Sequence, residues 1–288
     1  MAIYTINGHS LERGGYRMGV KPPPYKIVLS FSESSYDPSV ALPSKGQWER
    51  VSAEPNVWSL IPTNSTSWYQ LFYVGIIAGG CFMGTPETGG SVRLLYADLT
   101  GVTTAYRMFY GCVGLVSAEG LIGSDSLTNM YGMFDSCTNL ESVTLFDTRN
   151  VTTMANLFRY CSSLESIPAF RMDSVEELDY AFQGCSSLLS LHPIVSGSLK
   201  TIPYMCIGCF NLQAVPSITS GVLIRNCWYA FQNCYRVESG ALAAYTYLST
   251  HITAYATYTN CFTNTGSGTT SGSAELAQIP SSWGGTGA

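Results

Sequence analysis

Hydrophobic positions recur at intervals of 24 or 25 residues through the middle of the chain. The cysteines at this interval are Cys112, Cys137, Cys161, Cys185, Cys209 and Cys234. Phenylalanine stands three positions before five of these cysteines, and Leu or Val stands three positions after each. Because seven positions of the unit stay apolar in six copies, the pattern indicates an internal repeat. A weaker seventh copy is indicated at Tyr258-Thr-Asn-Cys261.

Each unit predicts a short helical turn followed by an extended piece. In the copy at 151–168, Met154, Leu157, Phe158 and Cys161 have the spacing of one helix face. The serines that follow compete for backbone hydrogen bonds and end the turn, and Pro168 ends the extended piece. A helix this short is unstable alone, so the units must stack and cover one another. The expected architecture is an α/β repeat of about six coils with short strands and short helical turns.

Upstream of the repeats, residues 1–24 are expected to form an N-terminal arm with a proline linker. Residues 25–97 are expected to form a mainly-β cap region, because apolar residues alternate over 25–31 and an open solenoid end needs cover for its strand edges. The segment 92–96 is the predicted last strand of this cap and is expected to pair with the solenoid. The repeats themselves are assigned to 98–240.

Downstream, residues 241–288 are expected to form a C-terminal cap with a mobile tail. The segment 241–248 is the predicted closing helix. Residues 263–274 are rich in Thr, Ser and Gly, a composition typical of a mobile segment. Trp283 is expected to pack back onto the cap.

The pattern V-T-x-M-x-x-(M/L)-F-x-x-C-(S/T)-(S/N)-L-x-S-(V/I/L) resembles the BspA-like leucine-rich repeat family of bacterial surface proteins, whose units bear a cysteine and have roughly 24 residues. The resemblance covers about half of the chain. It implies a right-handed, leucine-rich-repeat-like solenoid used for surface adhesion or protein contact, without catalysis, at the cell surface. The chain departs from the pattern where Cys206 replaces Phe and Cys227 replaces Met.

Composition excludes two classes of partner. The 288 residues include 14 Lys and Arg against 19 Asp and Glu, for a net charge of −5, and only 11% are charged. Binding to nucleic acid by counterion release, or to acidic lipid, needs a clustered basic surface that this balance does not supply. The longest apolar stretch, 73–83, is about half of the ~20 residues that span a membrane, and the first residues lack the pattern of a secretion signal. We therefore expect a soluble chain, although the family resemblance implies a surface location.

The ten cysteines permit two interpretations. An even number suggests a disulfide framework, but such frameworks are typical of short secreted chains. The common spacing of the cysteines favours small buried thiols that fill the core. Cys206 and Cys209 resemble half of a redox or zinc motif, yet both fall at core positions and no second half completes a zinc site. A bond between Cys206 and Cys227 across adjacent coils is a further hypothesis.

The sequence contains no catalytic constellation. His9, His192 and His251 are scattered without matching partners, and His192 falls at a variable surface position. Nucleophile-elbow, phosphate-loop, zinc-protease and dinucleotide motifs are absent. Asp147 and Asp173 are too sparse for a calcium cage. We expect no enzyme activity and no catalytic, cofactor or metal site.

The candidate contact residues lie in outward-facing columns of the repeat. Tyr180, Tyr204 and Tyr229 stand five positions before the cysteines of three successive units, and Trp228 stands beside Tyr229. Helical spacing turns these positions away from the buried face. One interpretation is that the stacked rings only shield each other and the coil edges. The other is an aromatic contact strip for a protein or glycan, because exposed aromatic residues on a rigid surface serve as binding hot spots.

The sequence thus favours a non-enzymatic scaffold for protein or glycan recognition or adhesion. Its expected partner is a protein or glycan on a host or neighbouring cell surface, with no nucleic acid and no membrane insertion. The alternative is a structural or receptor-binding part of a larger particle, such as a phage tail accessory protein, which the Gly-, Ser- and Thr-rich ends favour. An enzyme is the least favoured hypothesis, since no group of residues meets the criteria for an active site.

Overall fold

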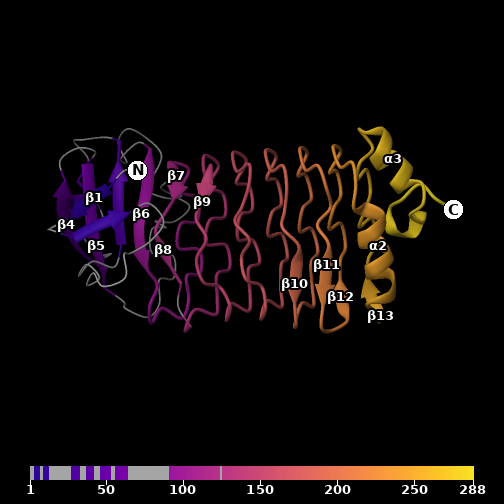
Figure 1. Ribbon diagram of the computed structural model, residues 1–288, viewed down its shortest axis with the longest axis horizontal. Helices are drawn as coiled ribbons and strands as arrows, with labels where there is room; N and C mark the ends of the chain where they lie inside the picture. Colours follow the sequence, from indigo (N-terminus) through magenta and orange to yellow (C-terminus); the bar gives the residue numbers. More distant parts are fainter. Residues whose placement is uncertain are drawn as a thin grey trace.

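The protein is an elongated stack of coils with a β-sheet at one end and helices at the other (Figure 1). The computed structural model describes residues 3–6, 9–12, 27–32, 37–41, 46–52, 56–63, 91–123 and 125–288. Neighbouring coils pair so that residues 24 or 25 positions apart in the sequence lie side by side. The repeat pattern is thereby confirmed as a solenoid of about seven coils, which correspond to the six clear copies and the weaker seventh copy of the sequence.

The N-terminal sheet continues directly into the coils. Its strands, in spatial order, are β4 (Gly46–Ser52), β5 (Asn56–Pro62), β3 (Ile27–Phe31), β6 (Val92–Asp98), β7 (Leu115–Ala118) and β9 (Ser142–Val143). Pairing is antiparallel from β4 to β6 and parallel from β6 onward. The predicted strand at 92–96 and its pairing with the repeats are therefore confirmed. Every residue of β3 is buried, rather than alternate residues, because β3 lies inside the sheet with both faces covered.

Three short elements complete the N-terminal part. They are the antiparallel hairpin of β1 (Ile3–Ile6) and β2 (His9–Glu12), helix α1 (Pro38–Ala41), and β8 (Leu121–Ile122), which pairs with β6. The segment expected to be an arm thus contains a hairpin. The apolar stretch at 73–83 lies outside the described residues. In the part of the chain that the structure describes, no helix has the length and hydropathy needed to cross a membrane.

One ladder of backbone pairs runs through the repeats. Parallel bridges join Thr104, Asn129, Thr153, Glu177, Thr201 and Asn226, each in its own coil. The short parallel strands are β10 (Ile194–Ser196) with β11 (Ile218–Ser220), and β12 (Ile224–Asn226) with β13 (Ile252–Thr257). Paired strands lie about 4.8 Å apart. Each side chain therefore stacks on its counterpart in the next unit.

The segment predicted as a short helical turn in each unit is not an α-helix but a series of tight turns. Met154, Leu157, Phe158 and Cys161 of the third coil are buried, as their spacing predicts, and Ala155 and Asn156 are buried as well. However, alternate amides leave the coil: Asn156 N donates to Asp179 O at 2.8 Å, whereas Leu157 N donates within the coil. Asn156 and Tyr160 have φ values of 57° and 58°, which an α-helix does not permit. Consecutive turns bring the same four positions to one side, so apolar spacing alone does not distinguish them from a helix.

The phenylalanine column forms a stacked ladder inside the solenoid. Phe109, Phe134, Phe158 and Phe182 stack with centroid distances of 5.5, 5.5 and 6.0 Å between successive rings. Cys206 takes the position in the fifth coil, and Phe231 and Phe262 continue the ladder at 5.6 Å. The six rings are at most 2% exposed, so this column is the centre of the core.

The cysteine column adds a hydrogen bond to each of the second to sixth coils. The thiols of Cys137, Cys161, Cys185, Cys209 and Cys234 each donate to the carbonyl of the residue that holds the phenylalanine position in the preceding coil, at 3.0–3.1 Å. In the seventh coil Thr265 takes this position, and its Oγ1 donates to Phe231 O at 2.7 Å. Cys261 instead lies directly before Phe262, at the position that Met108 and Met133 hold in the first two coils. The seventh copy therefore exists, but its Cys does not align with the cysteine column.

The state of the cysteines resolves most of the open alternatives. Eight cysteines of the described part are free and buried, and Cys112 is disulfide-bonded. The hypothesis of a Cys206–Cys227 bond is wrong, because both cysteines are free. The Cys206 thiol contacts Cys209, and the Cys227 thiol contacts Cys261. Burial raises the pKa of the Cys206 and Cys261 thiols, so neither has the low thiol pKa of a redox motif.

The C-terminal cap closes the stack. Its elements are α2 (Ala241–Thr250), α3 (Thr270–Leu276) and the 3-10 helix η4 (Ser281–Trp283). The closing helix is confirmed, and so is the predicted packing of Trp283, which is 6% exposed and stacks on Tyr258 at 4.4 Å. The stretch 263–274, expected to be mobile, instead forms turns that lead into α3, where the Thr269 side chain accepts a hydrogen bond from Gly272 N.

Candidate contact surface

The candidate residues form one continuous row of rings on the outside of coils four to six. Tyr180 and Tyr204 stack at 4.6 Å with an interplanar angle of 6°, and Tyr204 and Tyr229 stack at 5.2 Å and 22°. Trp228 leans on this row, 5.8 Å from Tyr204 and 4.8 Å from Tyr229. The structure therefore brings all four candidates together. Tyr180, Tyr204, Trp228 and Tyr229 form the aromatic strip.

The backbone under the strip is in the left-handed region. Tyr180, Tyr204 and Tyr229 have φ values of 55–58°, and the three coils before them hold Arg107, Gly132 and Asn156 at the same left-handed position of the unit. Left-handed backbone costs a bulky residue about 1–2 kcal/mol, whereas Gly adopts it freely and Asn at lower cost. Three successive coils thus hold a ring where a cheaper residue suits the backbone.

The outer edge of the strip is accessible. The three tyrosines are half-buried, and Trp228 is 38% exposed. Within the described part of the chain, no residue hydrogen-bonds to the three phenol groups, and none of these groups is enclosed. Burial, together with the neighbouring Tyr204 and Asp179, raises the pKa of Tyr180, so its phenol remains a hydrogen-bond donor at neutral pH.

A second pair of rings lies on the neighbouring position of the first two coils. Tyr106 and Tyr131 stack at 5.0 Å, and the Arg107 guanidinium lies 5.6 Å from each ring. In the third coil, small Ala155 and Asn156 separate this pair from the aromatic strip. The repeat pattern gives a signal for this pair, because its two tyrosines occupy equivalent positions of successive units, but the pair is not among the predicted contact residues.

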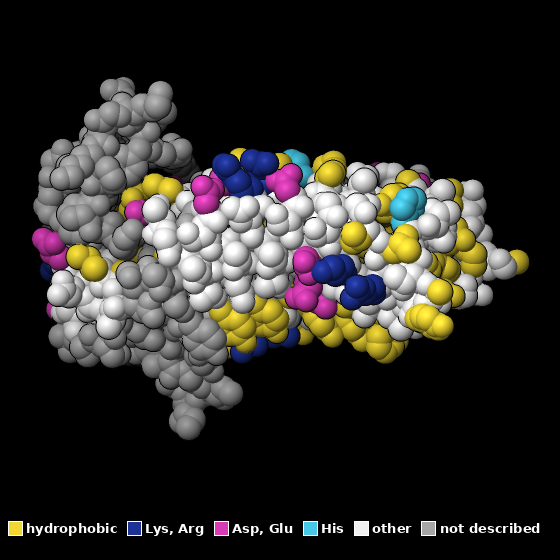
Figure 2. All heavy atoms as spheres, turned by 90° about the horizontal axis from the view of Figure 1, so that it is seen from below, with side chains coloured by type: hydrophobic (Ala, Val, Ile, Leu, Met, Phe, Trp, Pro, Cys, Tyr) yellow, Lys and Arg dark blue, Asp and Glu magenta, His cyan; other side chains and the backbone are white. Residues whose placement is uncertain are grey.

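Charged side chains accompany the strip along one side. Glu176 of the fourth coil pairs with Lys200 of the fifth, and the Thr201 hydroxyl donates to Asp179 at 2.6 Å. Arg225 of the sixth coil is exposed and forms no ion pair with any residue that the structure describes. The side of the strip is therefore acidic at the fourth coil and basic at the sixth. Charged groups of both signs lie beside hydrophobic side chains in Figure 2.

Asp135 of the second coil and Arg159 of the third form an ion pair in which the Asp135 side chain is buried and the Arg159 side chain is partly exposed. Arg159 donates from Nε at 3.1 Å and from Nη2 at 3.0 Å to the two oxygens of Asp135, whose side chain is fully buried. Burial raises the pKa of Asp135, and the hydrogen bonds from Arg159 oppose this effect. Because both partners satisfy each other, the pair joins two coils and presents no free charge.

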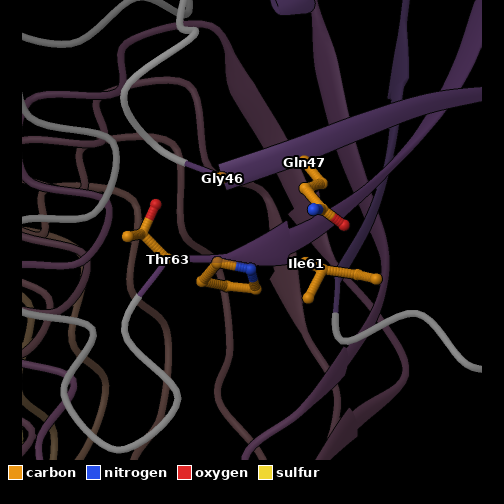
Figure 3. Close-up of a pocket in the computed structure, with 5 residues that line it drawn as sticks. Gly46, Gln47, Ile61 and Thr63 are labelled. Atoms are coloured by element: carbon orange, nitrogen blue, oxygen red, sulfur yellow. The ribbon is translucent and has the colours of Figure 1, made fainter.

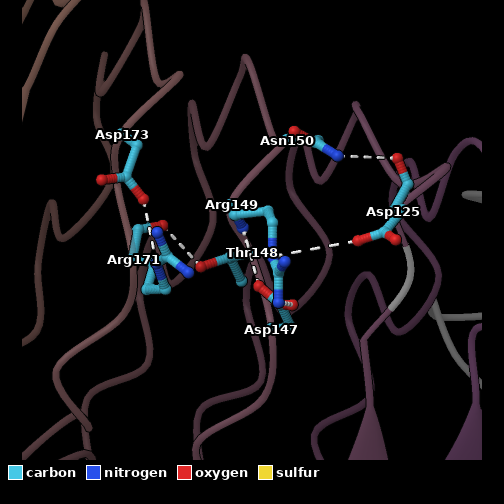
Figure 4. Close-up of polar contacts among 7 residues, drawn as sticks. All are labelled: Asp125, Asp147, Thr148, Arg149, Asn150, Arg171 and Asp173. Carbon is cyan, nitrogen blue, oxygen red and sulfur yellow. Dashed lines mark hydrogen bonds and ion pairs between the residues drawn. The ribbon is translucent and has the colours of Figure 1, made fainter.

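Asp147 and Asp173, the acidic residues considered as calcium ligands, belong to a separate polar cluster with two arginines. Arg149 pairs with Asp147 and lies 3.8 Å from Asp125, and Arg171 pairs with Asp173 at 3.0 Å (Figure 4). Each carboxylate therefore faces a guanidinium, and the hydrogen bond from Arg149 lowers the pKa of Asp147. No group of three metal-ligating side chains occurs among the described residues.

A hollow lies at the outer edge of the N-terminal sheet. Its volume is about 430 Å³, and its lining residues are Gly46, Gln47, Ile61, Pro62 and Thr63 (Figure 3). These residues supply one amide and one hydroxyl but no titratable group. His192, the histidine within the repeats, is exposed, and no hydrogen bond joins it to another described residue.

Stacked units of about 24 residues, with columns of leucine, phenylalanine and cysteine, define this solenoid as a leucine-rich-repeat protein. Residues 156–279 match the family model described as BspA type leucine rich repeat region, in 6 copies, and the repeats belong to this type. Residues 95–193 match a family described as Mycoplasma protein of unknown function, DUF285. No curated protein and no solved structure matches the chain.

Proposed function

We propose that the protein is a non-enzymatic scaffold that binds a protein or glycan partner through the aromatic strip. BspA-type repeats suggest a scaffold for protein binding or adhesion. The residues that carry the proposed contact are Tyr180, Tyr204, Trp228 and Tyr229. A surface location, and a partner on a host or neighbouring cell, are part of the same proposal.

The observation that carries the proposal is the left-handed backbone of the tyrosines in three consecutive coils, Tyr180, Tyr204 and Tyr229. Each ring pair returns about 0.5–1.5 kcal/mol by stacking, which only offsets the strain of about 1–2 kcal/mol per residue. Stacking therefore gives little net stability to explain why Tyr stands there. Strained residues persist at sites that bind, and Tyr and Trp dominate binding hot spots.

Tyr204→Asn tests the proposal directly. Asparagine suits the left-handed backbone, so we expect the free energy of unfolding to change by less than about 1 kcal/mol. Binding to hits from a glycan array and from a phage-displayed peptide library should weaken about tenfold or more, as for a hot-spot residue. Thermal unfolding and biolayer interferometry on the same samples measure both quantities.

Tyr255→Asn is the matched control, because Tyr255 is 97% exposed on β13 and lies outside the strip. It should leave both stability and binding unchanged. If Tyr204→Asn instead lowers stability strongly and leaves all binding intact, the rings serve packing and the proposal is wrong.

A further inference from the structure

The faces of the central tyrosine are already occupied. Tyr180 lies 4.6 Å from one face of Tyr204, and Tyr229 lies 5.2 Å from the other, both close to parallel. A sugar binds aromatic residues by laying its C–H face on a free ring face. The centre of the strip offers no such face, and what it presents outward are ring edges and phenol groups.

These groups attract hydrogen-bond acceptors and negative charge. The edge of an aromatic ring carries the positive part of its quadrupole, and a protonated phenol is a donor. The phenols of the strip have no partner within the described residues, so they are available to an incoming acceptor. Successive coils place the donors about 4.8 Å apart along the solenoid.

An exposed arginine at one end of the strip favours one orientation of a charged ligand. Arg225 is exposed, stands three residues before Trp228, and has no ion-pair partner among the described residues. Its equivalent in the fifth coil, Lys200, is neutralised by Glu176. The fourth coil carries Glu176, Glu177 and Asp179, so an acidic ligand is favoured at the sixth coil and disfavoured at the fourth.

We infer that the strip takes an extended acidic segment of a protein, with its carboxylates at the Trp228 and Arg225 end, rather than a glycan. This inference rests on the proposed function and names its partner class. Tyrosines contribute contact area and hydrogen bonds with little loss of side-chain entropy, which is how protein-binding surfaces use them. The unpaired arginine and the row of phenols together match carboxylate and carbonyl oxygens along one chain.

The test uses two fluorescein-labelled random peptide libraries of one length, with Asp and Glu at alternate positions in the first and Asn and Gln at the same positions in the second. Fluorescence anisotropy with the full chain should show about tenfold tighter binding of the acidic library at low salt. Raising the salt should reduce this preference, because exposed charges are screened.

Two variants separate the parts of the inference. The triple variant Tyr180→Phe, Tyr204→Phe and Tyr229→Phe keeps the stacked rings and removes only the phenol groups, so it should keep its melting temperature and lose roughly tenfold in affinity. Arg225→Gln should abolish the preference for the acidic library. Tyr255→Phe is the control for a phenol outside the strip and should change nothing.

The outcomes distinguish the inference from the function it rests on. If a glycan from the array binds and depends on Tyr204, while Arg225→Gln and the triple variant leave that binding unchanged, the scaffold function stands and the acidic segment is wrong. Equal binding of the two libraries overturns the inference as well. If Tyr204→Asn alters no binding of any kind, the proposed function itself fails.

Discussion

In the second to sixth coils a buried thiol both fills space and donates a hydrogen bond. Cys185 illustrates the arrangement, since its sulfur lies 3.0 Å from the carbonyl oxygen of Phe158 in the coil before. That carbonyl also accepts from Cys161 N, so the thiol ties two coils at a point where the backbone turns. Thr265 shows that a hydroxyl serves the same role at this position.

A pair of variants at Cys185 tests the role of the donor. Cys185→Thr keeps a donor, whereas Cys185→Val has nearly the same shape and none. We expect the valine variant to be less stable than the threonine variant by about 1 kcal/mol, the net worth of one hydrogen bond. Urea unfolding measures the difference. Equal stability of the two variants would mean that the column requires only size.

At the scale of an element, α2 begins without a capping side chain of its own. Its N-cap is Gly240, with a φ of 91°. The carboxylate of Glu275, from α3, accepts from Leu242 N at 3.0 Å and from Gly240 N at 3.3 Å. A carboxylate at this end satisfies free amides and interacts favourably with the helix dipole. The closing helix therefore depends on α3 for its first turn.

Glu275→Ala should destabilise the cap by about 1–2 kcal/mol, the usual cost of losing an N-cap side chain. Glu275→Gln keeps an acceptor without the charge and should lose less. Glu238→Ala, at an exposed glutamate of the sixth coil, is the control and should have little effect. A loss for Glu275→Ala no greater than that of the control would show that the contact does not stabilise α2. Chemical unfolding of the three variants provides the comparison.

At the scale of the whole molecule, each coil contacts only its neighbours, and the two ends are closed by different structures. The N-terminal end is covered by the sheet that contains β6, and the C-terminal end by α2, α3 and Trp283 (Figure 1). In such a stack the stability of a coil is its own plus that of its interfaces. Coils in the middle, with two neighbouring coils each, should therefore open least often.

The buried free cysteines can be used to measure how often each coil opens. Cys161 and Cys185 lie in the middle coils and Cys261 in the last, and all three are 0% exposed with thiol pKa values raised by burial. Under native conditions we expect a thiol reagent, followed by peptide mass spectrometry, to label Cys261 before the other two, because labelling requires opening. Simultaneous labelling of all three would instead indicate that the solenoid opens as one unit.

Predictability differed between kinds of feature. Positions such as Phe158 and Cys161 could be assigned to the core because identical residues recur there at a constant interval. Such a recurrence is expected when the repeat units stack on one another and bury these positions. The local conformation could not be assigned, because turns and a helix place Met154, Leu157 and Phe158 on the same side. The left-handed backbone of the three tyrosines could be suspected only because Gly132 and Asn156, which adopt it easily, stand at the same position of the unit. For the surface, the row Tyr180–Tyr204–Tyr229 could be anticipated, but the unpaired Arg225 could not, because pairing depends on contacts between coils.

Taken alone, the order of residues determined the repeat, the solenoid and the inward columns, since an apolar side chain at one position of every unit has nowhere to be buried except against the next unit. Tertiary structure decided the rest: the alignment of the seventh coil, the partner of each thiol, the contact of Glu275 with α2, and which ring faces and charges stay open. These depend on distances across coils, set by backbone hydrogen bonds between segments that the linear pattern does not relate.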